Sequence, residues 1–428
     1  MDVKQINMPG PENIHRVTLP NQSVLLSFHN ASTKSVHLVG LLSCGSVHEP
    51  KEKLGLANFT AAMLTRGTRS MPFAHFHNEL ESRGANLAFA SGANHIWFKG
   101  QALAEDAEWL FRLASDCLQE PVFPEEYTER LRTQLLTSLA IRDQDTSEMA
   151  SLLFDQMLFP GHPYGQPLDG YPQTVQAIQR EDLVQFHQDF FSPAGMMIAV
   201  AGAITPDDAN RLAMRHIGGW QKSAPAFPAA MPLPPAPDCI TRQHKHLDDK
   251  SQTDLVLGTI GPARTSKDYL PVYLGNNILG QFGMMGRIGE SVRTKSGLAY
   301  HASSNISAWQ DSGSWEFAAG VNPDNLSKTI DLIRSEIKRY VEVPVTKEEL
   351  DDSKSHLIGR LPLSLESNAG LANALLAIER FSLGLDYYQQ YAVRIQAISA
   401  EDILAASRRY LHPDKLVVAS AGPGEVAA

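Results

Sequence analysis

The chain has 428 residues, of which 43% are apolar and 20% are charged, an ordinary balance for a globular protein. Its length exceeds the size at which one hydrophobic core stops growing, so we expect at least two domains. The net charge of −10 and the lack of a basic run argue against nucleic-acid binding, and the longest apolar runs are too short to cross a membrane.

The N-terminal sequence MDVKQINMPGPENIHRVTLPNQ contains no apolar segment of the kind that directs secretion. Three cysteines, Cys44, Cys117 and Cys239, form an odd set without the spacing of a metal site. Free thiols are typical of a reducing compartment. These features predict a cytoplasmic protein, with a processed export precursor as the alternative.

The stretch GLANFTAAML, residues 55–64, has the apolar pattern of a short helix packed on a sheet. It lies between GSVHEP, residues 45–50, and TRGT, residues 65–68. This frame resembles the active-site region of the pitrilysin/insulinase family of zinc peptidases, the inverzincins, which reads G-S-x-x-E, then G-L-A-H-F-x-E-H-M, then G-T. The residues that keep the frame are Gly45, Ser46, Glu49, Gly55, Leu56, Ala57, Phe59, Met63, Gly67 and Thr68.

The residues that would bind and use zinc are replaced within this frame. In the H-x-x-E-H motif of the family, two histidines one helical turn apart hold the ion, and the glutamate is the general base. By the resemblance these positions are Asn58, Ala61 and Ala62, and the third ligand, a glutamate on a later helix, corresponds to Ser138. Methyl groups and a lone amide cannot form the ligand set of a catalytic zinc, so we expect neither metal nor cofactor in this chain.

Two stretches of the chain repeat each other at an offset of 220 residues. Residues 175–204 and residues 395–424 each predict an amphipathic helix that opens with an acidic pair, a turn at a proline and a short apolar strand. Before the first of them, GHPYGQPLDG, residues 161–170, resembles the loop that follows the ligand-bearing helices in the family.

A looser similarity links residues 98–131 with residues 317–350, each of which predicts a strand followed by two helices. Thr346 and Glu349 have the spacing of a capping box at the start of the last of these helices. Strands that alternate with long amphipathic helices predict an α+β fold. We expect two similar domains, each a mostly antiparallel β-sheet with helices packed on one face.

A proline-rich segment, QKSAPAFPAAMPLPPAPD, separates the two similar halves. Its six prolines cannot continue a helix or a sheet ladder and favour an extended connection. We therefore predict an N-terminal peptidase-like domain over residues 1–220, a linker over residues 221–239 and a C-terminal peptidase-like domain over residues 240–428.

The sequence HKHLDD is a possible metal site, because His244, His246 and Asp248 occupy alternate positions that would point the same way on a strand. The resemblance instead places them at an ordinary exposed strand start, and no complementary ligands follow. A metal site here is the less favoured interpretation, and the same holds for His75 and His77.

LGQFGMMGRIGESVRTKSGLAYHASS, residues 279–304, resembles the C-terminal domain of the family, in which a glycine-rich turn precedes an arginine and a G-L-x-Y sequence. The resemblance implies that Tyr300 donates a hydrogen bond to the oxyanion and that Arg293 binds the substrate backbone or a carboxylate. A phenol and a planar guanidinium suit these roles. The alternative is a solvated arginine and a strand aromatic. The glycine-rich turn lacks Walker spacing, which argues against nucleotide binding.

By the resemblance, an active site of this family combines the zinc-binding residues with the arginine and tyrosine of a C-terminal domain. In this chain the zinc-binding residues are replaced, and the arginine and tyrosine are kept. By the resemblance we expect the non-catalytic subunit of a heterodimeric zinc metallopeptidase, supplying Arg293 and Tyr300 to the active site of a homologous partner with an intact H-x-x-E-H. The zinc would lie in that partner, and the substrates would be short or unfolded peptides, with no nucleic acid and no membrane involved. The alternative is a catalytically silent scaffold or binding subunit of a larger complex.

Overall fold

The computed structural model describes residues 8–224, 232–283 and 286–423. The chain forms two compact units, and each unit is assembled from three segments. The first contains residues 1–139, 167–230 and 361–390, and the second contains residues 140–166, 231–360 and 391–428. The domain boundaries at residues 220 and 240 stay a prediction, and residues 225–231 of the expected linker lie outside the described part of the chain.

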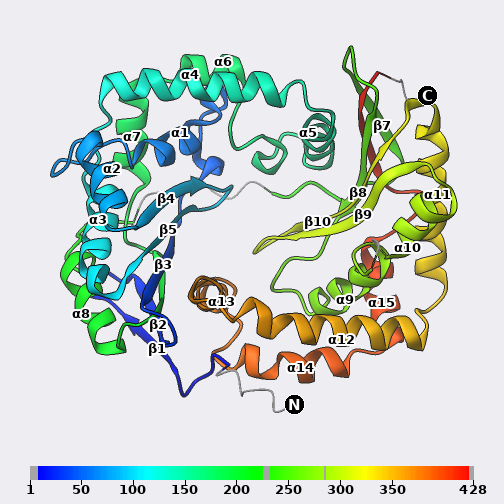
Figure 1. The fold of residues 1–428 in the computed structure, drawn as a ribbon. Helices are drawn as coiled ribbons and strands as arrows, with labels where there is room; N and C mark the ends of the chain where they lie inside the picture. The colour runs from blue at the N-terminus through cyan, green and yellow to red at the C-terminus, as the bar shows by residue number, and fades with distance from the viewer. Residues whose placement is uncertain (1–7, 225–231, 284–285, 424–428) are drawn as a thin grey trace. The chain divides into compact units, whose positions relative to one another are not determined.

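The first unit contains a six-stranded sheet with the order β1-β2-β6-β3-β5-β4 (Figure 1). Neighbouring strands are antiparallel except β2 and β6, which are parallel. The strands are β1 (Ile14–Thr18), β2 (Val24–His29), β3 (Ser35–Leu42), β4 (Asn86–Ser91), β5 (Ile96–Leu103) and β6 (Met197–Gly202).

Most helices of the first unit share one core with one face of this sheet, on which Ile198 and Val200 of β6 are fully buried. These helices are α1 (Leu56–Met63), α2 (Phe73–Ser82), α3 (Ala107–Gln119), α4 (Glu125–Arg142), α7 (Arg180–Phe190) and α8 (Pro206–His216). A short helix, α6 (Pro172–Ala177), precedes α7. Successive residues of a strand point to opposite faces, so Ala199 and Ala201 belong to a second core.

The second unit contains a five-stranded sheet with the order β7-β11-β8-β10-β9. Here too one pair, β7 and β11, is parallel and the other pairs are antiparallel. The strands are β7 (Thr241–His246), β8 (Thr253–Ile260), β9 (Ala299–Ala308), β10 (Gly313–Val321) and β11 (Val417–Gly422). The helices that belong mainly to this unit are α5 (Thr146–Leu158), α9 (Tyr269–Gly280), α10 (Gly286–Gly289), a π-helix (Glu290–Lys295), α11 (Leu326–Glu342), α12 (Lys347–Ser364), α14 (Tyr387–Ala397) and α15 (Ala400–Tyr410).

One helix in each unit comes from the other half of the sequence. Helix α13 (Asn368–Arg380) packs on β6, β3 and β2 of the first sheet, where its leucines form the second core with Leu26, Phe28, Val39 and Leu41. A bidentate ion pair between Arg16 and Glu379 adds to this contact, with both N···O distances at 2.8 Å. Helix α5 packs in the same way on β11 and β8 of the second sheet.

The predicted fold class is confirmed, with two mostly antiparallel sheets and helices packed on them. The helices that cover the second face of each sheet, α13 and α5, are an addition that the sequence did not indicate. Helices α7 and α15 begin at residues 180 and 400, and strands β6 and β11 begin at residues 197 and 417, each pair 220 residues apart. Among the described residues, no helix is long and apolar enough to cross a membrane.

Candidate functional site

Helix α1 begins at a glycine that no other residue can replace without strain. Gly55 has a φ of 96°, and a Cβ there would lie 2.8 Å from the carbonyl oxygen of Asp169. The Glu49 carboxylate accepts hydrogen bonds from the backbone N–H groups of Gly55 and Ala57, at 3.0 and 2.6 Å. The retained frame residues Gly55 and Glu49 therefore shape the start of the helix.

The four positions that correspond to the zinc site carry no metal ligand set. Asn58 and Ala62 are half-buried and Ala61 is 1% exposed on α1, while Ser138 is exposed on α4. Among the residues that the structure describes, no group of three or more His, Cys, Asp or Glu side chains is arranged to hold a metal ion. The chemistry of these side chains does not fit zinc.

Helix α4 is tied to its surroundings by a buried arginine that the sequence did not single out. Arg132 is 5% exposed and donates hydrogen bonds to the carbonyl oxygens of Val175 and Ile178, at 2.8 and 2.6 Å. Its guanidinium carbon lies 5.6 Å from the ring centroid of Phe59 on α1. The two helices that would carry zinc ligands in the family are thus joined here by packing.

The alternative metal site is engaged in other contacts. His244 makes hydrogen bonds through both ring nitrogens, to the Ser420 hydroxyl at 2.9 Å and to the Gly422 carbonyl at 3.0 Å. His246 pairs with Asp248 at 3.0 Å on the exposed side of β7. These bonds use the nitrogens that His244 would need for a metal.

Arg293 lies on the π-helix that follows α10. Its side chain is half-buried, and no ion pair or side-chain hydrogen bond to it is found within the described residues. The backbone continues through Gly297, whose φ of 63° reverses the chain toward β9. π-Helical turns are rare and occur often at functional sites. Arg293 therefore has no ion-pair partner among the described residues, and it lies on a locally unusual backbone.

Tyr300 lies at a β-bulge at the start of β9, an edge strand. Ala299 is paired with Val321 and His301 with Gly320, so Tyr300 between them has no partner on β10. Its side chain is 82% exposed, although tyrosine usually buries most of its ring. Bulges re-aim side chains and are common beside active sites. No hydrogen bond or cation–π contact within the described chain joins Tyr300 to Arg293.

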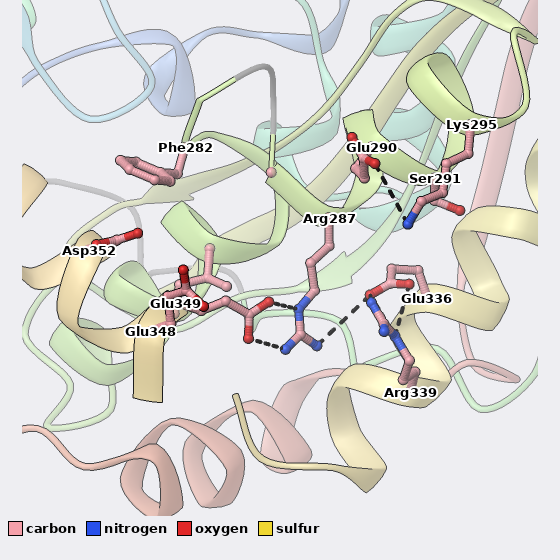
Figure 2. A pocket seen from close by; sticks show the side chains of 12 residues that line it. Phe282, Arg287, Glu290, Ser291, Lys295, Glu336, Arg339, Glu348, Glu349 and Asp352 are labelled. Carbon is pink, nitrogen blue, oxygen red and sulfur yellow. Dashed lines mark hydrogen bonds and ion pairs between the residues drawn. The ribbon is translucent and has the colours of Figure 1, made fainter. Parts of the chain in front are cut away.

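A network of charged side chains lies beside the segment that carries Arg293 (Figure 2). Arg287 of α10 donates two hydrogen bonds to the carboxylate of Glu349 of α12, at 2.7 and 2.6 Å. Its Nη1 lies 3.9 Å from Oε1 of Glu336 on α11. Burial disfavours the charged form of Glu349, but the Arg287 and Thr346 contacts outweigh it and lower its pKa to about 2. A cavity of about 710 Å³ opens next to this network.

The capping box predicted at Thr346 and Glu349 is confirmed. The Thr346 backbone N–H donates to Glu349 at 2.8 Å, and the Glu349 N–H donates back to the Thr346 hydroxyl at 3.2 Å. The pairing of Glu349 with Arg287 was missed, because they are 62 positions apart in the sequence and capping-box spacing says nothing of a distant partner.

Two family models match the chain. The model described as Insulinase (Peptidase family M16) matches residues 24–170, and the one described as Peptidase M16 inactive domain matches residues 177–357. An uncharacterized zinc protease of Streptomyces coelicolor is 25% identical over 94% of this chain and 88% of its own length. The non-peptidase homolog YmxG of Helicobacter pylori is 25% identical over 82% of this chain and 81% of its own.

Solved structures share the fold over 97% of the chain. The crystal structure of a peptidase M16 inactive domain from Pseudomonas fluorescens has a TM-score of 0.89 at 26% identity, covering 97% of this chain and all of that one. A protease from Helicobacter pylori has a TM-score of 0.87 at 19% identity, with the same coverage, and at that identity only the fold is comparable.

Proposed function

Because this chain belongs to the insulinase family (peptidase family M16) as an inactive-type member, we propose that it is the non-catalytic subunit of a heterodimeric zinc peptidase. Its partner is a homologous chain with an intact H-x-x-E-H, and the zinc lies in that partner. The substrates are short or unfolded peptides. Three free cysteines support a cytoplasmic location, because exported proteins usually pair them.

The observation that carries this proposal is the exposure of Tyr300. A tyrosine that is 82% exposed and aimed by a bulge, with a half-buried arginine seven residues before it, is poorly explained by packing. In the partner's active site Tyr300 donates its O–H to the developing oxyanion. Arg293 holds the substrate backbone or carboxylate through its planar fork. The residues on α1 support a structural role for that helix.

The test of these roles is steady-state kinetics of the complex reconstituted with the catalytic partner. Tyr300→Phe should lower kcat by about 10²–10³-fold and leave KM nearly unchanged, because it removes one oxyanion donor. Arg293→Ala should raise KM at least as much as it lowers kcat, because the fork binds both ground and transition states. Size-exclusion chromatography checks that the variants still assemble.

Arg360→Ala provides the matched control, since Arg360 is an exposed arginine on α12 and should leave both constants unchanged. Metal analysis of the dialysed chain should find less than one zinc per chain, because Asn58, Ala62 and Ser138 cannot bind it. Wild-type kinetics from both Tyr300→Phe and Arg293→Ala would contradict the proposed roles.

A scaffold role is the second candidate, supported by the Helicobacter pylori relative whose name describes a non-peptidase homolog. In that case the chain binds its partners without contributing to catalysis. An inactive mixture of this chain with its genuine partner, each correctly folded, favours the scaffold role over the peptidase.

A further inference from the structure

The segment that carries Arg293 is short and has few apolar anchors. Helix α10 has four residues and runs directly into the six-residue π-helix. Ile288 and Val292 are fully buried, and they set how deeply the segment lies against the core. Packing of two aliphatic side chains is not directional. A directional contact adds a restraint on how the segment is rotated, and therefore on where Arg293 points.

Arg287 makes that directional contact from the first turn of the segment (Figure 2). Its Nε donates to Oε1 of Glu349 at 2.7 Å, and its Nη2 donates to Oε2 at 2.6 Å. Its side chain is 10% exposed. Paired N–H groups on one carboxylate fix orientation as well as distance, which a single contact does not.

The carboxylates that receive Arg287 are themselves held in place. Glu349 also accepts from the backbone N–H and the hydroxyl of Thr346, at 2.8 and 3.0 Å. Glu336, whose side chain is 9% exposed, accepts from Nη2 of Arg339 at 2.6 Å. The guanidinium of Arg287 thus enters a pre-formed acidic socket built by α11 and α12.

Stability alone is a weak reason for such a network. Replacing a buried ion pair by apolar side chains of similar volume is often neutral or stabilising. Apolar side chains at positions 287, 336 and 349 together would pack in the same space, but they would supply no paired hydrogen bond that orients the segment. The ion pair is therefore better explained by its effect on the orientation of the π-helical segment than by its contribution to the free energy of folding.

We propose that Arg287 is a positioning residue, whose fork in the Glu349–Glu336 socket fixes the π-helical segment so that Arg293 meets the substrate. This inference rests on the proposed function, because that function assigns Arg293 to the substrate. Arg287 itself does not touch the reacting atoms. Its effect on the reaction passes entirely through Arg293.

The first experiment measures hydrogen exchange of the isolated chain. Arg287→Met keeps side-chain length but removes the fork, so amide exchange across residues 287–297 should become faster. Arg334→Met is the matched control, since Arg334 joins α11 to Asp414 at 2.7 Å and is likewise partly buried. It should leave exchange across residues 287–297 unchanged. Arg287→Lys keeps the charge without the fork, so it is the second variant and tests the same contact with the positive charge retained.

The second experiment measures kinetics of the reconstituted complex. Arg287→Met and Arg287→Lys should raise KM by roughly ten- to a hundredfold, as we also expect for Arg293→Ala, since misplacement of a binding group costs about this much. The double variant Arg287→Met/Arg293→Ala should match Arg293→Ala within about twofold, because coupled residues are not additive. Arg334→Met should behave as wild type.

The outcomes separate the two ideas. If Arg293→Ala raises KM while Arg287→Met and Arg287→Lys do not, the positioning role is wrong and the proposed function stands. If Arg293→Ala itself has no effect, the proposed function is wrong. Independently of the kinetics, unchanged amide exchange across residues 287–297 in Arg287→Met would show that the contact of Arg287 with Glu349 and Glu336 does not hold the segment in place, and the positioning role would be wrong. Fully additive effects in the double variant would show that Arg287 does not act through Arg293.

Discussion

The side chain of Glu49 caps the start of helix α1, and the ionisation of its carboxyl changes the free energy of unfolding. Burial raises the pKa of its carboxyl from 4.5 to about 8, although the Gly55 and Ala57 N–H groups favour the ionised form. Between these two pH values the folded chain keeps a proton that the unfolded chain has lost. The free energy of unfolding therefore falls as pH rises through this window and is level above it.

We expect Glu49→Gln to remove most of this pH dependence. One pKa unit corresponds to about 1.4 kcal/mol, so the wild-type chain should lose on the order of a few kcal/mol from this group between pH 5 and pH 8.5. Urea unfolding at both pH values measures the difference. Glu52→Gln, at a nearby exposed carboxylate, is the control and should retain the wild-type slope. The same slope in Glu49→Gln would show that Glu49 titrates normally.

Among the single elements, β10 places a glycine, Gly320, directly beside the bulge in β9. A Cβ on Gly320 would lie 2.4 Å from Nε2 of Gln252 and 2.7 Å from Cε1 of His301. Both atoms end side chains that can move, so the sheet should survive the substitution. His301 follows Tyr300 directly, and its displacement should change the direction of Tyr300.

Gly320→Ala should therefore lower kcat of the reconstituted complex with little change in KM, in the manner of Tyr300→Phe. Overpacking of this kind should also cost about 1–3 kcal/mol of stability. Gly359→Ala on α12 is the matched control, because nothing lies within 4 Å of its added Cβ. There alanine should stabilise the helix by about 0.5–1 kcal/mol and leave the kinetics unchanged. A wild-type kcat in Gly320→Ala would show that the geometry of the bulge does not affect catalysis.

The helices and strands were largely predictable, because their apolar periodicity is local. The pattern after Val175 marks both α7 and β6, and the same pattern after Ile395 marks α15 and β11. The apolar periodicity of α13 predicts that the helix has an apolar face. It does not indicate which of the two sheets that face covers. Both sheets offer small and aliphatic residues, so the exchange of α5 and α13 had no signal in the sequence.

The candidate site was predictable in its residue types but not in its backbone. The frame around Gly55 identified the replaced ligand positions, and Arg293 and Tyr300 were identified by resemblance. The π-helix and the bulge were missed, because each inserts one residue into a regular element without a distinctive composition. The socket of Arg287 was missed because contacts between residues far apart in sequence leave no spacing to detect.

At the scale of the whole molecule, the exchange of segments makes each unit dependent on both halves of the chain. Residues 1–223 contain all six strands of the first sheet but lack α13. Leu371, Leu375, Leu376 and Ile378 of α13 are buried, and together they contribute about 6–12 kcal/mol. This is comparable with the total stability of a domain, about 5–15 kcal/mol.

We therefore expect fragment 1–223 to lack a cooperative unfolding transition and to bind a hydrophobic dye. Co-expression with residues 232–428 should restore cooperative unfolding, because it supplies α13. Circular dichroism during heating and dye fluorescence measure both states. A fragment 1–223 that is monomeric, does not bind dye and unfolds cooperatively would show that α13 is dispensable.

The position of α13 also has a consequence for synthesis on the ribosome. About 165 residues separate the end of β6 from the start of α13. At about 5–20 residues per second, translation needs roughly ten to thirty seconds to cover that distance. During this time Leu26, Phe28, Val39 and Leu41 of the nascent sheet have no helix over them. We therefore expect the first sheet to gain from chaperones that shield nascent chains until α13 has emerged.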